Sequence, residues 1–203
     1  MGKNPKVTGS ATVGGKAKVA GHAEVSGEAK VSGKSKVSGH AVVTGSAVIS
    51  GSAWVHGHAS VSGSAKVVDH SEVKGSAVLG DKCKVSGHAE VGGKAKLSGR
   101  SQVSGSAVVS GDAVLTDNAW VSGQAEVAGK AVINGDAAVA GAAEILKESH
   151  VVTLTDQDSG VVWTAYRTRH DGRQILKGRT MVEESEAPKE LLQATRKAWY
   201  SRG

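Results

Sequence analysis

Residues 5–58 decide the fold, and they read PKVTGS ATVGGK AKVAGH AEVSGE AKVSGK SKVSGH AVVTGS AVISGS AWVHGH. The same six-residue pattern, Ala-x-Val-x-Gly-x, runs without interruption to AEILKE at 143–148 and gives 24 hexads. The third position is always Val, Ile or Leu, and the first is Ala, Ser or Cys in all but the Pro5 hexad. The fifth is Gly in 20 of the first 23 hexads. A fixed period of this kind indicates a repeat architecture.

Each hexad position has a physical reason. Alternate side chains of an extended segment point to one side, so the first and third residues are expected to face inward. The fifth residue lies where the chain turns, and Gly tolerates the left-handed backbone conformation there. Asp is among the few other residues that accept this conformation, which accounts for Asp69, Asp81 and Asp117 at this position.

Three hexads form one triangular coil, so the 24 hexads predict eight coils. With neighbouring strands about 4.7–4.9 Å apart, the prism is roughly 38 Å long. The predicted fold class is therefore all-β, a parallel β-helix with no inserted loop. It occupies residues 1–148.

The six-residue register ends at His150, so residues 149–203 are predicted to form a separate capping module. HVVTLT, VVWTAYRT and RQILKG read as strands, with DQDSG and RHDGR as turns between them. A helix follows, with Ser185 or Glu186 as its cap, Pro188 in its first turn, and Leu191, Leu192 and Trp199 on one face. Such a module would cover the sheet edge that a solenoid leaves open.

The hexads, for example GHAEVSG, and the WTAYRT-RHDGR segment resemble the hexapeptide-repeat proteins of bacteria and their phages. The repeat part of the resemblance covers residues 5–148. It implies left-handed winding of the β-helix, which the sterics of the hexad do not determine. Some proteins of this type are labelled acyltransferases on their fold alone, but a fold does not carry a function.

Composition and charge narrow the class of protein. The net charge is +6, and by count it is +5 over residues 1–36 (seven Lys, two Glu) and −4 over 101–148 (two basic, six acidic). Without a recognition helix or an aromatic platform, this charge does not predict nucleic-acid binding. No apolar segment predicts a membrane partner or a secretory signal, so synthesis in the cytoplasm is expected. The single cysteine, Cys83, is at an inward position and is expected to be a core thiol.

Histidines supply the candidate catalytic and metal-binding residues. His22, His40 and His58 share one corner column, spaced about 5 Å apart, and are the candidate metal ligands. His70 and His88 form a second pair. Because the sixth hexad position accepts many polar residues, ordinary surface positions are the favoured explanation of both groups. If the chain is an acyltransferase, His56 and His58 are the candidate catalytic residues, and no carboxylate is expected beside them to orient either ring.

Outward apolar side chains supply the candidate binding residues. Trp54 and Trp120 are predicted on different faces, where an exposed Trp can anchor a contact. A second feature is a column on one face, interrupted by Ser60 and Lys96, that contains Val42, Val78, Val114 and Val132. A flat apolar stripe favours self-association, for which a homotrimer is expected; the alternatives are a different protein partner and ordinary surface aliphatic residues.

Taken together, the sequence favours a non-enzymatic rigid scaffold, of the kind expected for a phage- or prophage-encoded structural, decoration or binding protein. Incorporation into a virion would follow from that interpretation. No cofactor is expected. The alternatives are a hexapeptide-class acyl- or acetyltransferase, for which acetyl-CoA would be the cosubstrate, and a sequestering or host-interaction protein.

Overall fold

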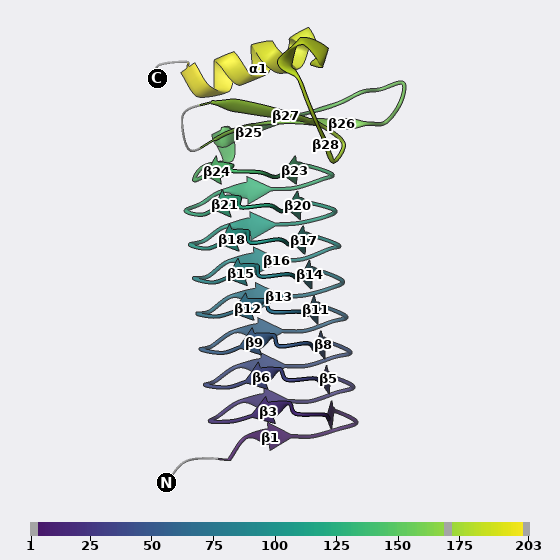
Figure 1. The fold of residues 1–203 in the computed structure, drawn as a ribbon, viewed down its shortest axis with the longest axis vertical. Helices are drawn as coiled ribbons and strands as arrows, with labels where there is room; N and C mark the ends of the chain where they lie inside the picture. The colour runs from purple at the N-terminus through teal and green to yellow at the C-terminus, as the bar shows by residue number, and fades with distance from the viewer. Residues whose placement is uncertain (1–3, 169–171, 201–203) are drawn as a thin grey trace.

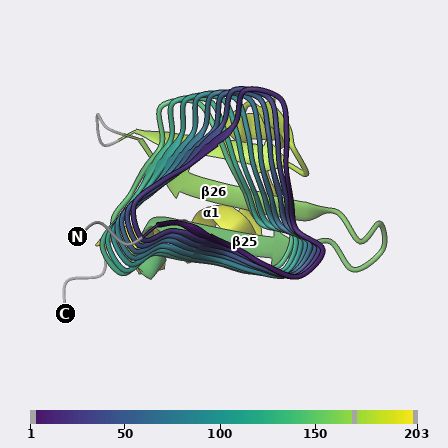
Figure 2. The ribbon, with the colours of Figure 1, turned by 90° about the horizontal axis from the view of Figure 1, so that it is seen from below.

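The computed structural model describes residues 4–168 and 172–200, and it is a three-sided prism closed at one end by a small module (Figure 1). Three parallel sheets of eight two-residue strands form the sides, and each strand pairs with the strand three hexads further along. Viewed along the axis, the coils superpose as a triangle and wind in the left-handed sense (Figure 2). The predicted eight-coil left-handed β-helix is confirmed.

The strands are short because each side of the triangle holds one hexad. Sheet A contains β1 (Lys6–Val7), β4 (Glu24–Val25), β7 (Val42–Val43), β10 (Ser60–Val61), β13 (Val78–Leu79), β16 (Lys96–Leu97), β19 (Val114–Leu115) and β22 (Val132–Ile133). Sheet B contains β2 (Thr12–Val13), β5 (Lys30–Val31), β8 (Val48–Ile49), β11 (Lys66–Val67), β14 (Lys84–Val85), β17 (Gln102–Val103), β20 (Trp120–Val121) and β23 (Ala138–Val139). Sheet C contains β3 (Lys18–Val19), β6 (Lys36–Val37), β9 (Trp54–Val55), β12 (Glu72–Val73), β15 (Glu90–Val91), β18 (Val108–Val109), β21 (Glu126–Val127) and β24 (Glu144–Ile145).

The core of the prism is made of the first and third hexad positions, as the hexad pattern predicts. From Ala23 to Ile145 these Ala, Val, Ile and Leu side chains are almost completely buried. At the corners from Gly9 to Gly141 the fifth residue has a positive φ, for example 71° at Gly51 and 53° at Asp81. A Cβ added at Gly51 would lie 2.7 Å from the backbone nitrogen of Asp69 on the next coil, so close coil stacking also requires glycine there.

The three Asp residues at corners do more than tolerate the turn. Asp69, Asp81 and Asp117 each accept a hydrogen bond on Oδ2 from the backbone N–H of the glycine one coil later, at 2.9–3.0 Å. Each carboxylate therefore ties its coil to the next one. The sequence pattern alone accounts for the backbone conformation but not for this added bond.

The first coil departs from the prediction that every third-position aliphatic residue is buried. Val7 and Val13 are 46% and 40% exposed, and Val19 is only partly buried. A third-position side chain is covered by the coils on both sides of its own. The first coil has a neighbour on one side only, so the prediction is wrong for these residues.

The C-terminal module is a four-stranded antiparallel sheet with one helix across it. Its strands are β25 (Val151–Thr155), β26 (Val162–Arg167), β27 (Arg173–Lys177) and β28 (Thr180–Val182). The first three match the predicted strands, and β28 was not predicted. The RHDGR turn lies partly outside the described residues. The single-turn 3₁₀ helices η1 (Glu148–His150) and η2 (Glu184–Glu186) precede β25 and the helix α1 (Lys189–Tyr200).

The predicted cap of the helix is wrong in detail. Ser185 and Glu186 belong to η2, where the Glu186 side chain accepts a hydrogen bond from the backbone N–H of Glu183. α1 begins at Lys189, directly after Pro188. The predicted inner face is confirmed, because Leu191 is buried and Leu192 and Trp199 pack against the same cluster. In the described part of the chain, no helix has the length and apolar character needed to cross a membrane.

Two side chains of β26 connect this module to the last coil. Thr164 Oγ1 accepts a hydrogen bond from the N–H of Ala138, and the Tyr166 hydroxyl accepts one from the N–H of Ala140 while donating to the Ala140 carbonyl. In earlier coils, the equivalent N–H groups donate to carbonyls of the next coil, for example Trp120 to Ala137 and Ser122 to Val139. The module thus supplies side-chain oxygens where a ninth coil would supply carbonyls.

Candidate functional site

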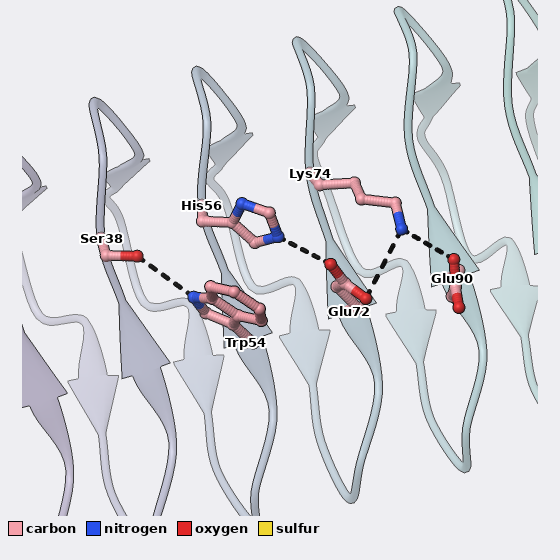
Figure 3. A network of polar contacts seen from close by, with 6 residues as sticks. All are labelled: Ser38, Trp54, His56, Glu72, Lys74 and Glu90. Atoms are coloured by element: carbon pink, nitrogen blue, oxygen red, sulfur yellow. Dashed lines mark hydrogen bonds and ion pairs between the residues drawn. The ribbon is translucent and has the colours of Figure 1, made fainter.

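The most elaborate polar cluster on the prism surrounds Trp54, which is on β9, and His56, which directly follows this strand (Figure 3). Their rings stack with centroids 4.0 Å apart and planes inclined by 25°. Trp54 Nε1 donates a hydrogen bond to Ser38 Oγ at 3.1 Å. Trp54 remains 41% exposed, so one edge of the cluster is open to solvent.

The expectation that no carboxylate accompanies the His56–His58 pair is wrong. His56 Nε2 lies 2.7 Å from Glu72 Oε1, with both side chains about one quarter exposed. Glu72 is also 3.5 Å from the Lys74 ammonium, which lies 2.8 Å from Glu90 (Figure 3). The side chains of His56, Glu72, Lys74 and Glu90 therefore form a continuous chain of polar contacts across successive coils of sheet C.

Two pKa values in this chain depart from their ordinary range. Burial alone would raise the pKa of Glu72, but the hydrogen bond with His56 and the Lys74 ammonium together bring that pKa below its usual value. The hydrogen bond to Glu90 raises the pKa of Lys74, aided by the negative charge of Glu72. At neutral pH both carboxylates accept hydrogen bonds, and Lys74 is a cation between them.

A single spacing rule explains these contacts, and the hexad register does not reveal it. Ser38 and Trp54, His56 and Glu72, and Lys74 and Glu90 are all 16 residues apart. The fourth position of one hexad therefore meets the second position of the hexad one coil later on the same face. Stacking the sequence coil by coil places these partners in different columns, which is why Glu72 was missed.

The cluster fixes one histidine and leaves the other outside it. A carboxylate bound to one ring nitrogen orients an imidazole and selects which nitrogen carries the proton. With Nε2–H donating to Glu72, the neutral His56 ring presents Nδ1 as its acceptor. His58 belongs instead to the corner column, so the two candidate catalytic histidines do not converge on one point.

The corner column of His22, His40 and His58 is confirmed, and its geometry argues against a metal site. Successive rings stack at 4.6 and 4.9 Å with planes within 4° of parallel. A metal bound to imidazole lies close to the plane of the ring, and two stacked, nearly parallel rings with centroids 4.6 Å apart share no such point. Over residues 4–168 and 172–200, no three His, Cys, Asp or Glu side chains are arranged to hold a metal ion. His70 and His88 stack similarly, at 5.0 Å.

The two outward tryptophans have different surroundings. Trp54 is on sheet C and Trp120 on sheet B, so the prediction of different faces is correct. Trp120 is only partly exposed, packs against the core, and lies under the Arg179 guanidinium at 5.3 Å. Because the C-terminal module covers it, Trp120 is a poorer contact anchor than Trp54.

The valine column lies on sheet A in the predicted order. Val42, Ser60, Val78, Lys96, Val114 and Val132 are successive register partners. Val78 is 42% exposed, and the other three valines are partly exposed. The stripe is thus a real surface feature, whereas the association expected from it stays a prediction.

Cys83 is inside the prism, as expected from its inward position. Its side chain is buried, and burial raises the pKa of the thiol to about 12. A thiol that stays protonated at neutral pH is neither a nucleophile nor a metal ligand.

Three regular faces, a coil of three hexads and a left-handed sense of winding together define one known architecture. The chain has the hexapeptide-repeat left-handed β-helix fold. No family model matches the β-helix or the rest of the chain, and no curated protein matches it.

Two solved structures are similar to the β-helix at low sequence identity. A hexapeptide transferase family protein from Anaplasma phagocytophilum is 16% identical, with a TM-score of 0.47 over 96% of this chain and 86% of that one. A UDP-N-acetylglucosamine acyltransferase from Campylobacter jejuni is 12% identical, with a TM-score of 0.26 over 98% of this chain and 84% of that one. Neither similarity assigns an activity to this chain.

Proposed function

We propose that this protein is a non-enzymatic rigid scaffold that holds two attachment points at a fixed separation. The observation that supports this most directly is the unbroken backbone ladder between coils. Nearly every outward second and fourth position donates its N–H to the coil above, from Lys6 to Ala128. No inserted loop interrupts this ladder, so the shaft has no loop that could wall a deep cleft, whereas ligand sites are normally concave.

The finer form of this proposal is a phage- or prophage-encoded structural or decoration protein that assembles as a homotrimer. The resemblance of the hexads and of the WTAYRT segment to phage-encoded proteins supports the origin. The exposed valine column on sheet A supports self-association, because closed cyclic symmetry suits a flat repeated face. A virion location and a further protein partner belong to the same proposal.

A second candidate function is acyl or acetyl transfer from acetyl-CoA, and the His56–Glu72 contact favours it. An imidazole held by a carboxylate is a recurrent general-base arrangement. Two features weigh against this candidate. The His56 ring is stacked against Trp54, and the exposed edge of Trp54 opens the cluster to solvent, whereas general-base catalysis requires a site that holds the substrate and limits water.

Activity assays on purified protein distinguish the two candidates. The expected result is no acetyl transfer from acetyl-CoA to a panel of amine and hydroxyl acceptors. The decisive variants are His56→Ser/His58→Ser and Glu72→Gln. His70→Ser/His88→Ser is the matched control, because it removes two outward histidines that lie outside the cluster.

Transfer activity that is lost in the first two variants and retained in the control would replace the scaffold proposal with the enzyme. Absence of transfer in all four proteins is the outcome that the scaffold requires. All the substitutions are at outward positions, so the melting temperature is expected to stay close to that of the wild type.

A further inference from the structure

Four cations meet in a hollow on the side of the prism remote from the Trp54 cluster. Lys66 and Lys84 point outward from β11 and β14 of sheet B, while Lys82 and Arg100 occupy the neighbouring corner between sheets A and B on consecutive coils. Together with Ser64 and Gln102 they line a hollow of about 390 Å³. Lys82 and Arg100 also border a second one, of about 370 Å³, at the corner itself.

These cations have no carboxylate partner of the kind that Lys6 and Lys74 have. Lys6 lies 3.5 Å from Glu24, and Lys74 lies between Glu72 and Glu90. Lys66 and Lys84, by contrast, are direct register partners on adjacent strands. Among the described residues, no carboxylate lies within ion-pair distance of either one, or of Lys82 or Arg100. Like charges directly opposite one another on a sheet destabilise it.

The nearest carboxylate only partly balances this charge. Asp81 borders the corner hollow, and one of its oxygens accepts the Gly99 N–H. Asp117 is next along the same corner and is bound in the same way to Gly135. Four cations against Asp81 leave a local charge of +3 over three consecutive coils.

We infer that this hollow binds the oligophosphate chain of a small, multiply charged anion. Phosphate oxygens suit the donors present: Arg100 offers a planar fork for two hydrogen bonds, and the lysines offer point charges on flexible stems. Ser64 and Gln102 add neutral donors at the two ends of the hollow. Because consecutive coils are about 4.8 Å apart and the four cations lie on three of them, a chain of linked phosphates reaches cations on more than one coil, whereas a single phosphate reaches fewer of them.

The chain contains its own control for charge alone. Lys16 and Lys34 occupy the corner between sheets B and C, and Lys18 and Lys36 are register partners beside them on sheet C. This second group also contains four cations, on two adjacent coils instead of three. It has no arginine, and Lys36 lies 6.0 Å from the ring centre of Trp54. If the anion is held by diffuse charge attraction, removing cations from either group should weaken its binding equally. If it is held in a defined site, only substitutions in the first group should weaken binding.

The test is titration calorimetry with inorganic tripolyphosphate at about 0.15 M salt, where interactions beyond about 8 Å are screened. The wild type is expected to bind tripolyphosphate more tightly than orthophosphate. Lys82→Gln/Arg100→Gln is expected to weaken tripolyphosphate binding at least about tenfold, and Lys16→Gln/Lys34→Gln by less than about twofold. ATP serves as a further arm: equal affinity assigns recognition to the phosphate chain, and tighter binding assigns part of it to the nucleoside.

Three results would overturn the inference: no binding at millimolar tripolyphosphate, unchanged binding in Lys82→Gln/Arg100→Gln, or equal weakening in both double variants. Circular dichroism and melting curves check that each variant is folded. If the first variant fails this check, Lys66→Gln/Lys84→Gln replaces it, since both side chains are exposed on sheet B.

Discussion

At the residue scale, the corner aspartates show how one side chain serves both conformation and cohesion. Asp81 has a φ of 53° and accepts the Gly99 N–H at 2.9 Å. Glycine at this position would relieve the backbone but lose the bond. A residue without a polar side chain would lose the bond and keep the strain.

We therefore expect Asp81→Ala to be more destabilising than Asp81→Gly. Loss of the hydrogen bond costs about 1 kcal/mol, and a non-glycine residue in the left-handed region adds on the order of 1 kcal/mol. Thermal unfolding of the two variants and the wild type measures their relative stability. An alanine variant as stable as the glycine variant would contradict this account.

The residue scale is also where sequence reasoning is strongest and where its limit appears. Burial of the third positions and the turn at the fifth follow from alternation and from glycine's conformational freedom. The exposure of Val7 does not follow, because it depends on what lies beyond the first coil. The Glu72 contact with His56 does not follow either, because it depends on the direction in which outward side chains lean along the axis.

At the scale of elements, the junction between β26 and the last coil determines how the prism ends. Thr164 and Tyr166 are two residues apart on β26, and the Ala138 and Ala140 N–H groups that they accept from are also two apart. The strand pattern predicts β26 itself. It does not predict this match, because nothing in the period of a strand specifies which of its side chains meets a neighbouring backbone.

Tyr166→Phe is expected to weaken the junction while the shaft stays folded. The substitution leaves the Ala140 N–H and carbonyl without their partner, which costs about 1–3 kcal/mol for a buried polar group. Hydrogen exchange should become faster in β26 and around Ala140 and stay unchanged in the middle coils. Uniformly faster exchange along the whole prism would argue against a local role for Tyr166.

Alkaline pH tests the same junction without a mutation. Burial raises the pKa of the Tyr166 phenol from 10.0 to about 12. A raised folded-state pKa gives stability that is fully present below pH 10 and is lost as the pH rises through 12. The loss is on the order of 3 kcal/mol. The wild type should lose stability over this range more steeply than Tyr166→Phe, and parallel curves would contradict the assignment.

At the scale of the whole molecule, the flat face of sheet A is the feature that bears on assembly. We expect Val78→Lys/Val114→Lys to convert the proposed homotrimer to monomers, because the two charges would be buried in a largely apolar contact. Light scattering at micromolar concentration measures the mass. The matched control is Val48→Lys/Val108→Lys, since these outward valines lie on sheets B and C.

An unchanged mass in the sheet A variant, or a monomeric wild type, would refute the trimer. If the control variant dissociates to the same extent, the subunit contact is not specific to sheet A. The period of the hexads was enough to place the valines on one face. It could not establish assembly, which depends on a surface in another chain.

Because paired strands are always three hexads apart, the length of the shaft is set by the number of coils that the gene encodes. A duplication or deletion of one whole coil would lengthen or shorten the shaft by about 4.8 Å and keep every surviving partner in register. A change of one or two hexads would move the outward side chains to a different face, and a change that is not a multiple of six residues would shift aliphatic side chains out of the interior. A gene with this period can therefore gain or lose whole coils during evolution. Each such change alters the length of the shaft by the same amount and leaves its cross-section unchanged.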